Sequence, residues 1–427
     1  MPASTLAAPR AALGWRRGVG YAALGVPLAF VSLPLYVQLP YHYASVFGMP
    51  LASIGLVMLA VRLLDAFIDP ALGRAADALF RRGRAWRAAA GGSAVLAIAF
   101  AALWSPPSAQ ARALLAWLVA ALLLCTLAYS GVSIVHQSWG ARWGGGPEWR
   151  ARVTGWREAG TLTGVLLASV LPTLLGWPAT SLALALLLAV GLAGLGRLGA
   201  VAATGAEPAP PSSANSPWRH TAFRQLLAVF ILNGIANAIP ATLLPFFIAD
   251  RLQLPHWQAS LLLAYFGAAV LGLPLWVRAA GRWGLAPVWR AGMLASVLAF
   301  AATPLLGAGD GAAFAAICLC SGLSLGADLA LPGALLTGVI HRAGAGQRDE
   351  GVFIGWWTCA TKLNLALAAG LALPLLAALG YRSGGADASG LQALAWAYGG
   401  LPCLLKLAAA ALLWRAEGLN PSWKDRG

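Results

Sequence analysis

Charged side chains are scarce in this chain of 427 residues. They make up 10% of the sequence, whereas 59% is hydrophobic and the mean hydropathy is +0.73. A soluble domain carries about one-quarter charged residues, so this composition excludes a soluble globular protein. Apolar runs long enough to cross ~30 Å of hydrocarbon recur along the whole chain. The sequence therefore predicts an all-α polytopic membrane protein.

Cysteine and histidine are also few, with five of each. All five cysteines fall in apolar runs, without metal-ligand spacing and without companion histidines. The chain has no His/Glu metal pair, no nucleophile elbow and no phosphate loop. We therefore expect no metal centre, no cofactor and no enzyme, apart from a coupling ion, H⁺ or Na⁺.

About twelve apolar segments are expected to be transmembrane helices, separated by turn signals such as Pro106-Pro107. They cover residues 19–40, 50–72, 88–105, 111–139, 155–176, 180–200, 223–249, 257–277, 288–307, 311–338, 351–379 and 391–413. The longest polar, Pro-rich interruption, 204–220, divides six helices from six. The sequence thus predicts two halves, 1–203 and 221–427, joined by a cytoplasmic linker, which resembles the layout of major facilitator transporters.

The basic residues are placed asymmetrically. Of 29 Lys and Arg residues, 22 fall at the termini and in even-numbered connections, three in odd-numbered connections, and four in the apolar segments. By the positive-inside rule both termini should lie in the cytoplasm. No basic patch with interleaved aromatic residues is present, so the net charge of +15 does not indicate a nucleic-acid partner.

The second apolar segment carries three charges on one helix face. At ~100° per residue, Arg62 and Asp69 lie ~20° apart, with Asp65 within ~60° of both. Charges inside a membrane helix are costly unless they face a polar interior, so this face predicts an ion or proton pathway. The alternative is a structural pair of Arg62 with Asp65, leaving Asp69 as a helix-end charge.

A glycine-rich basic segment follows this helix. Gly73, Asp77, Gly83 and Arg84 resemble the major facilitator loop signature of Gly, Asp four residues on, then Gly-Arg. Its glycines permit close helix approach and a tight turn. We expect a conformational loop here, and the alternative is an ordinary basic cytoplasmic loop.

Residues 62–73 are similar to the helix-two motif of the glycoside-pentoside-hexuronide:cation symporters, the melibiose-permease branch of the major facilitators. Three further segments agree with this family's pattern: 129–141 followed by 152–159, 233–242, and 326–332 with 357–362. The resemblance implies the major facilitator fold, and it assigns cation binding to Asp65 and Asp69. A sodium ion at these two carboxylates is possible, but Ile68 stands where sodium-using members carry a polar side chain. This departure favours a proton.

The sugar-binding carboxylates of that family are absent here, since their positions fall near Ala29 and near Val132 or Ser133. The remaining candidates for substrate binding are polar or aromatic and expected to point inward: Tyr129, His136, Gln137, Trp139, Arg157 and Lys362. They could hold a sugar by stacking and hydrogen bonds or a carboxylate by their cations. Arg157 could instead neutralise Glu158, and Lys362 could form a structural ion pair.

These features predict a cation-coupled secondary symporter of a small polar solute, namely a sugar, glycoside or uronate, with protons favoured over sodium. A lipid or lysolipid carrier of the same fold is the alternative within transporters, and a membrane-embedded enzyme is the alternative of another class. The expected partners are the solute and the lipid bilayer. We expect a multi-pass monomer in the bacterial cytoplasmic (inner) membrane.

Overall fold

The computed structural model describes residues 14–108, 110–143, 147–198, 216–343, 350–385 and 387–419. These residues form helices and the turns between them, and no strand occurs among them. Eleven of the described helices are long and apolar enough to cross a membrane. The expected all-α polytopic class is confirmed.

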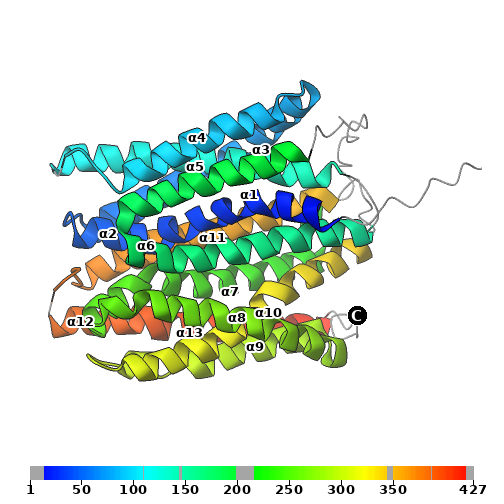
Figure 1. Cartoon of the computed structure of the whole chain (residues 1–427). Coiled ribbons are helices and arrows are strands. Elements are labelled where there is room, and N and C mark those ends of the chain that lie inside the picture. The colour runs from blue at the N-terminus through cyan, green and yellow to red at the C-terminus, as the bar shows by residue number, and fades with distance from the viewer. Residues whose placement is uncertain are drawn as a thin grey trace, which may run out of the picture. The chain divides into compact units, whose positions relative to one another are not determined.

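Figure 1 shows the helices, coloured from blue at the N-terminus to red at the C-terminus. Most crossings are single α-helices, whereas three contain a short π-helical stretch. Their bounds are α1 (Trp15–Leu33), η1 (Pro34–Gln38) and α2 (Leu39–Ser45), α3 (Leu51–Arg81), α4 (Ala85–Leu103), α5 (Ala111–Ala141), α6 (Pro147–Arg197), η3 (Pro217–Arg219), α7 (Thr221–Phe246) with η4 (Phe247–Arg251), η5 (Pro255–Trp257), α8 (Gln258–Trp283), α9 (Leu285–Phe300), η6 (Thr303–Leu305), α10 (Gly311–Arg342), α11 (Glu350–Ala378), α12 (Ala388–Ala395) with η7 (Trp396–Gly400), and α13 (Leu401–Leu419).

The longest helix, α6, contains a break. Gly176 has φ 73° and ψ 171°, which no helical residue adopts. Pro178 follows two residues later, and the indole of Trp177 stacks on Trp104 with ring centroids 3.3 Å apart. The segment therefore comprises two crossings on either side of the expected Gly-Trp-Pro turn, which brings the eleven helices to twelve crossings.

The chain forms two compact units. The first unit comprises the described residues within 1–32, 68–107 and 120–205, and the second those within 33–67, 108–119 and 206–427. The helices α3 and α5 contribute residues to both units. Most of the expected linker, 204–215, lies outside the described residues, so the division into halves 1–203 and 221–427 stays a prediction.

In the second unit, α8 and α10 pack with their backbones in close contact. A Cβ atom on Gly322 would lie 2.3 Å from the carbonyl oxygen of Tyr265, and one on Gly272 would lie 2.4 Å from that of Leu323. Small residues permit this approach between membrane helices. The contact sets Tyr265 of α8 and Asp328 of α10 in the interior of the unit.

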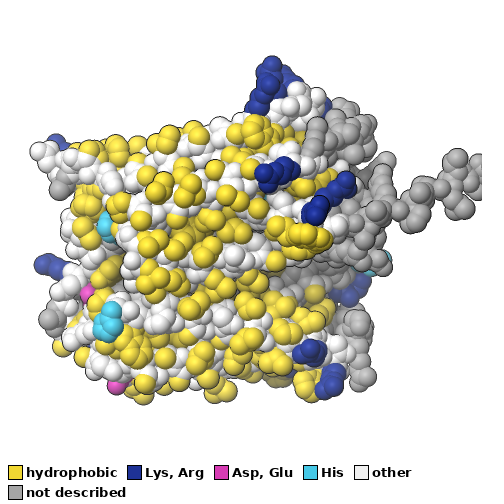
Figure 2. Space-filling view, viewed as in Figure 1, with side chains coloured by type: hydrophobic (Ala, Val, Ile, Leu, Met, Phe, Trp, Pro, Cys, Tyr) yellow, Lys and Arg dark blue, Asp and Glu magenta, His cyan; other side chains and the backbone are white. Residues whose placement is uncertain are grey.

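The exposed surface is apolar. Figure 2 shows hydrophobic side chains over most of the visible face, with Lys and Arg side chains gathered toward its ends. On α3, Leu63, Leu64 and Phe67 are 38%, 42% and 80% exposed, while Arg62 and Asp65 are buried. The helix therefore turns its charges inward and its apolar side chains outward, as the angular spacing predicts.

Only the second half of the segment expected to be a conformational loop lies outside the helices. Gly73 and the backbone of Asp77 lie within α3, which continues to Arg81. Only Gly83, with φ 64°, forms the turn, and Arg84 precedes α4 as its N-cap. The run of Ala and Leu between these glycines favours helix, which explains why the helix outlasts the first half of the motif.

Candidate functional site

The carboxylate of Asp65 lies in the interior of the second unit between two cations. Its side chain is 0% exposed. Lys362 Nζ donates to Oδ2 of Asp65 at 2.9 Å, and Arg62 Nη1 lies 4.0 Å from the same oxygen. One buried negative charge thus faces two positive ones. The group of three carries a formal charge of +1 when all are ionised.

Arg62 is oriented by an aromatic ring that the sequence did not point out. Its guanidinium carbon lies 3.8 Å from the ring centroid of Tyr36 in η1. A guanidinium over an aromatic face is stabilised by the ring quadrupole, more so when both are desolvated. Because Tyr36 holds the guanidinium from one side, Arg62 stays close to Asp65 at a salt-bridge distance that leaves room for Lys362.

Lys362 reaches Asp65 because α3 and α11 touch through glycines. A Cβ on Gly55 would lie 2.9 Å from the carbonyl oxygen of Ala369, and one on Gly370 would lie 2.8 Å from Cβ of Leu59. This backbone contact brings the middle of α11 against α3. The arrangement corresponds to the alternative reading of Lys362 as an ion-pair partner, whereas its assignment to substrate binding stays a prediction.

Asp69 follows Asp65 by four residues on α3 and belongs to the part of the helix assigned to the first unit. Its side chain and that of Ile68 are of intermediate burial. No group of three or more His, Cys, Asp or Glu residues able to hold a metal ion occurs in the described part of the chain. Cation binding at Asp65 and Asp69 remains a prediction.

A cavity of about 170 Å³ lies in the first unit between α1, α5 and α6. Four of the six predicted substrate residues line it, together with Ala29 and Ser133. The lining consists of Gly25, Leu28, Ala29, Ser32, Tyr129, Ser133, His136, Gln137, Arg157 and Thr161. The structure thus gathers Tyr129, His136, Gln137 and Arg157, which are separated by up to 28 residues in sequence, around one space.

Two members of this cavity already have partners. His136 is 2% exposed, its Nε2 donates to the carbonyl oxygen of Tyr21 at 2.9 Å, and its ring stacks on that tyrosine at 4.3 Å. Arg157 pairs with Glu158 at 2.9 Å, with side chains 35% and 55% exposed. An ion pair this exposed is weak, so Glu158 holds the guanidinium of Arg157 only weakly. The imidazole of His136, by contrast, is held by its hydrogen bond and its stacking contact, and it forms part of the cavity wall.

The two remaining candidates lie elsewhere. Trp139 is not part of the cavity lining; it is 4% exposed and its ring packs edge-on against Phe80 with centroids 5.6 Å apart. Lys362 belongs to the second unit and contacts Asp65. A tryptophan in an apolar helix can serve packing as readily as stacking on a sugar, and sequence alone does not separate the two.

A second buried ion pair was missed by the sequence interpretation. In the second unit, Lys406 of α13 donates to Asp328 of α10 at 2.9 Å and to Oδ1 of Asn233 of α7 at 3.0 Å. Trp289 and Asn237 donate to the same carboxylate at 2.8 and 2.9 Å. One signal was available, because Lys406 is one of only three lysines and lies in an apolar run.

Comparison with known proteins identifies a family model and several solved structures that this chain resembles. A family model described as MFS/sugar transport protein matches residues 19–417. Among solved structures, an inward-facing, unoccupied bacterial homologue of the human lysosomal transporter Spinster superposes with a TM-score of 0.66 at 14% identity, covering 94% of this chain and 96% of that one. The nucleoside transporter NupG gives a TM-score of 0.66 at 13% identity, with 93% and 98% covered, and a point mutant of it gives 0.69 at 16% identity with the same coverage. A search of curated proteins found no match. At these identities the solved structures show the major facilitator fold and nothing further.

Proposed function

The chain belongs to the MFS/sugar transport protein family and is a multi-pass membrane transporter, not an enzyme, and on this basis we propose that it is a cation-coupled symporter of a small polar solute. The solute is a sugar, glycoside or uronate, as the resemblance of residues 62–73 to the melibiose-permease branch suggests. The observation that carries the proposal is the fully buried carboxylate of Asp65 held by Lys362 and Arg62. Ionisable groups inside a membrane helix mark an ion pathway by default.

In this proposal, Asp65 exchanges one cation for another. Ionised Asp65 binds the ammonium of Lys362 at 2.9 Å. When a coupling cation neutralises the carboxylate, the attraction that holds the ammonium in a low-dielectric interior weakens steeply. Lys362 and the middle of α11 are then released from α3. Loading of the cation is thereby linked to helix movement, which alternating access requires.

A proton suits this exchange better than sodium. Sodium would have to displace both an ammonium and a guanidinium from Asp65 and then complete a shell of oxygen ligands. The neighbouring Ile68 provides no side-chain oxygen. A proton needs a single carboxylate oxygen, so protons remain the favoured coupling ion.

The cavity of the first unit is the proposed solute site. Tyr129, Gln137 and Thr161 present hydroxyl and amide groups that can donate to and accept from sugar hydroxyls. Arg157, once it exchanges Glu158 for the solute, can hold a uronate carboxylate by two parallel hydrogen bonds. The polar inventory of the lining therefore fits a polyhydroxylated solute with or without a negative charge.

A lysolipid carrier is the second candidate. Ala29 and Ser133 line the cavity, and the family resemblance places the sugar-binding carboxylates near Ala29 and near Val132 or Ser133. Without carboxylate acceptors the cavity lacks the strongest hydrogen-bond partners for sugar hydroxyls. Its lining is then better suited to bind an apolar chain. A solute panel separates the two candidates, since a lysolipid carrier should ignore all short sugars.

The test is uptake into proteoliposomes of labelled sugars, glycosides, uronates, nucleosides and lysolipids in sodium-free buffer. We expect one of the first three classes to accumulate under an inward proton gradient, and a protonophore to abolish the accumulation. Asp65→Asn and Asp69→Asn should lose accumulation by at least ~100-fold while retaining exchange of solute, because each removes an ion-binding charge. Glu417→Gln is the matched control, since Glu417 is a buried acid paired with Arg290 at 2.7 Å on helices α13 and α9.

Three outcomes would each contradict one part of the proposal. Accumulation by Asp69→Asn protein would show that this carboxylate carries no coupling ion. Wild-type uptake that requires sodium and ignores an imposed pH gradient would reject the proton and leave a sodium symporter. Uptake of lysolipids alone would show that the solute is a lysolipid and not a sugar. The coupling site would still be tested by the Asp65→Asn and Asp69→Asn variants.

A further inference from the structure

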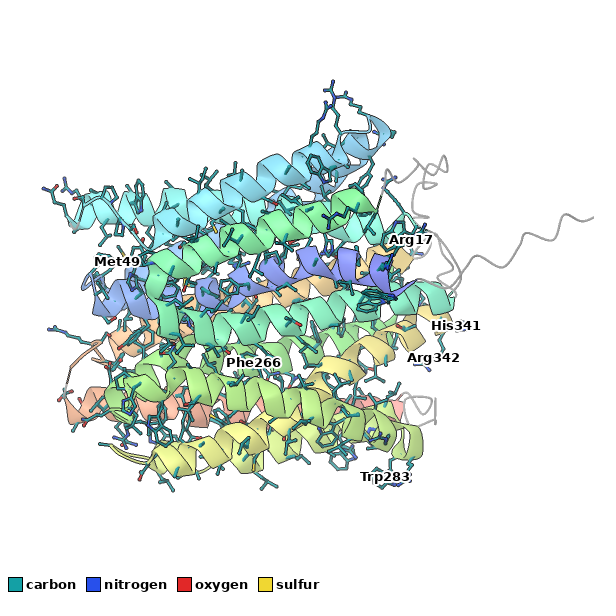
Figure 3. All side chains as sticks on the ribbon, in the orientation of Figure 1. Arg17, Met49, Phe266, Trp283, His341 and Arg342 are labelled. Carbon is teal, nitrogen blue, oxygen red and sulfur yellow. The ribbon has the colours of Figure 1, made fainter. Side chains whose placement is uncertain are left out.

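A second cavity, of about 100 Å³, lies inside the second unit and does not involve the coupling carboxylate. It is bounded by residues of α7, α8, α9, α10 and α13, and its walls include Phe266, Tyr265, Tyr398, Asn237, Asp328 and Lys406. In Figure 3 the labelled Phe266 lies between Met49 at one end of the second unit and Trp283 and Arg342 at the other. The cavity is therefore placed midway along the membrane-spanning helices of this unit.

The carboxylate of Asp328 at this cavity has all its acceptor sites filled. Asn233 and Trp289 donate to Oδ1 at 2.9 and 2.8 Å. Asn237 and Lys406 donate to Oδ2, both at 2.9 Å. A carboxylate accepts about four hydrogen bonds, so Asp328 has no capacity left for a ligand. Its role is to neutralise and position Lys406.

The ammonium of Lys406 is only partly used. Its contacts with Asp328 and Asn233 employ two of the three N–H donors of an ammonium. The side chain is 5% exposed and lines the cavity, so water is largely excluded from it. An unused buried donor is costly. The remaining N–H is available to an acceptor atom placed in the cavity.

Two hydroxyl groups join this donor. Tyr265 and Tyr398 both line the cavity, and neither hydroxyl has a hydrogen bond within the described residues. Tyr398 is 2% exposed and its ring is fixed by stacking on Phe247, with centroids 4.3 Å apart. A hydroxyl without a protein partner at a cavity wall has hydrogen-bonding capacity left for a ligand. A ligand oxygen would satisfy it.

Most of the remaining lining is apolar, although Ser296 and Ser321 add two hydroxyl groups. Leu261, Leu262, Phe266 and Phe300 contribute side chains without polar atoms. An apolar cavity of ~150 Å³ accommodates a benzene ring, so a cavity of about 100 Å³ has room for one small ring or a short branched chain at most. The lining thus combines a few polar groups with a larger number of side chains that favour hydrocarbon.

We infer that this cavity is a binding site for a neutral ring-sized group that bears one hydroxyl, with the oxygen accepting from Lys406 and hydrogen-bonded to Tyr265 or Tyr398. Neutral ligands are favoured over anions because Asp328 already balances the charge of Lys406, so a carboxylate would bring an uncompensated charge into the interior. The site is independent of the coupling proposal, which rests on Asp65 and on the cavity of the first unit.

The experiment is ¹⁹F NMR on the full-length protein in lipid nanodiscs with three probes that share one ring. 4-Fluorobenzyl alcohol is neutral with an acceptor oxygen, 4-fluorobenzoate is an anion, and 4-fluorotoluene lacks the oxygen. We expect a saturable bound resonance for the alcohol with at least ~10-fold tighter binding than for the other two, since a hydrogen bond to a charged donor discriminates by about that factor. Partition into lipid is not saturable and is recorded with empty nanodiscs.

Two variants locate the site. Ala241 lines the cavity and carries no polar contact, so Ala241→Phe fills the space while leaving the ion pair intact; the saturable resonance should disappear. The double variant Asp328→Asn, Lys406→Met removes donor and counter-charge together, which avoids leaving one charge buried alone, and should reduce discrimination between the alcohol and 4-fluorotoluene to less than ~3-fold. A saturable resonance that survives Ala241→Phe, equal binding of all three probes, or no saturable binding would overturn the inference. Proton-driven uptake is measured separately, so that failure of either proposal leaves the other standing.

Discussion

Two lysines stand in membrane helices of this chain, and each is placed against a buried aspartate. Lys362 pairs with Asp65 and Lys406 with Asp328, both at 2.9 Å. The pairs differ in what else surrounds the carboxylate. Asp328 accepts from three further neutral donors, whereas Asp65 faces the second cation of Arg62. We therefore propose exchange of cations at the first pair and a fixed hydrogen-bond donor at the second.

At the residue scale, Lys362→Met should lower the free energy of unfolding by roughly 3 kcal/mol, because it removes the ammonium that lies 2.9 Å from the buried carboxylate of Asp65. Replacing both partners, Asp65→Asn with Lys362→Met, should recover most of that loss, since no buried charge remains without its partner. Denaturant unfolding in detergent micelles measures both. A double variant no more stable than Lys362→Met would show that the pair has little influence on stability.

At the scale of elements, glycines determine where helices break and where they touch. Gly176 interrupts α6 with a backbone conformation closed to other residues. Gly55 and Gly370 instead lie within regular helices and let α3 and α11 approach until Asp65 meets Lys362. A glycine in the sequence can therefore either end a helix or let two helices pack closely. Which of the two it does depends on the neighbouring helix.

Gly176→Ala should destabilise the protein by about 1–3 kcal/mol, because φ 73° with ψ 171° is essentially restricted to glycine although nothing lies within 4 Å of the added Cβ. Gly155→Ala is the control on the same element, since Gly155 is helical and its Cβ would also meet nothing within 4 Å. The control should be neutral or stabilised by up to ~1 kcal/mol. Thermal unfolding of the two variants compares them, and equal midpoints would refute strain at Gly176.

At the scale of the whole molecule, composition and family agree on a multi-pass transporter. The helices carry apolar side chains outward, and the buried charges are concentrated in interior pairs. Basic residues fall at the termini and in alternate connections, and the positive-inside rule predicts an orientation from this distribution. We predict that both termini and the 204–220 linker are cytoplasmic.

This orientation is tested at Ser212, in the linker. In a variant with its five cysteines replaced, Ser212→Cys should react with a membrane-impermeant maleimide only after the cells are permeabilised. A cysteine at Arg251→Cys, in an odd-numbered connection, should react in intact cells and serves as the control. Labelling of the linker from outside intact cells would invert the topology.

The sequence by itself determined the membrane class, the crossings and the face of α3 that carries Arg62 and Asp65. These depend on local properties, since hydropathy and a period of 3.6 residues are written along a single helix. Only the tertiary structure decided which residues meet. Lys362 lies 297 positions from Asp65, and Lys406 lies 78 from Asp328. Such partners are chosen by the packing of glycines and small side chains between helices, and a linear pattern of hydrophobicity carries no record of that packing.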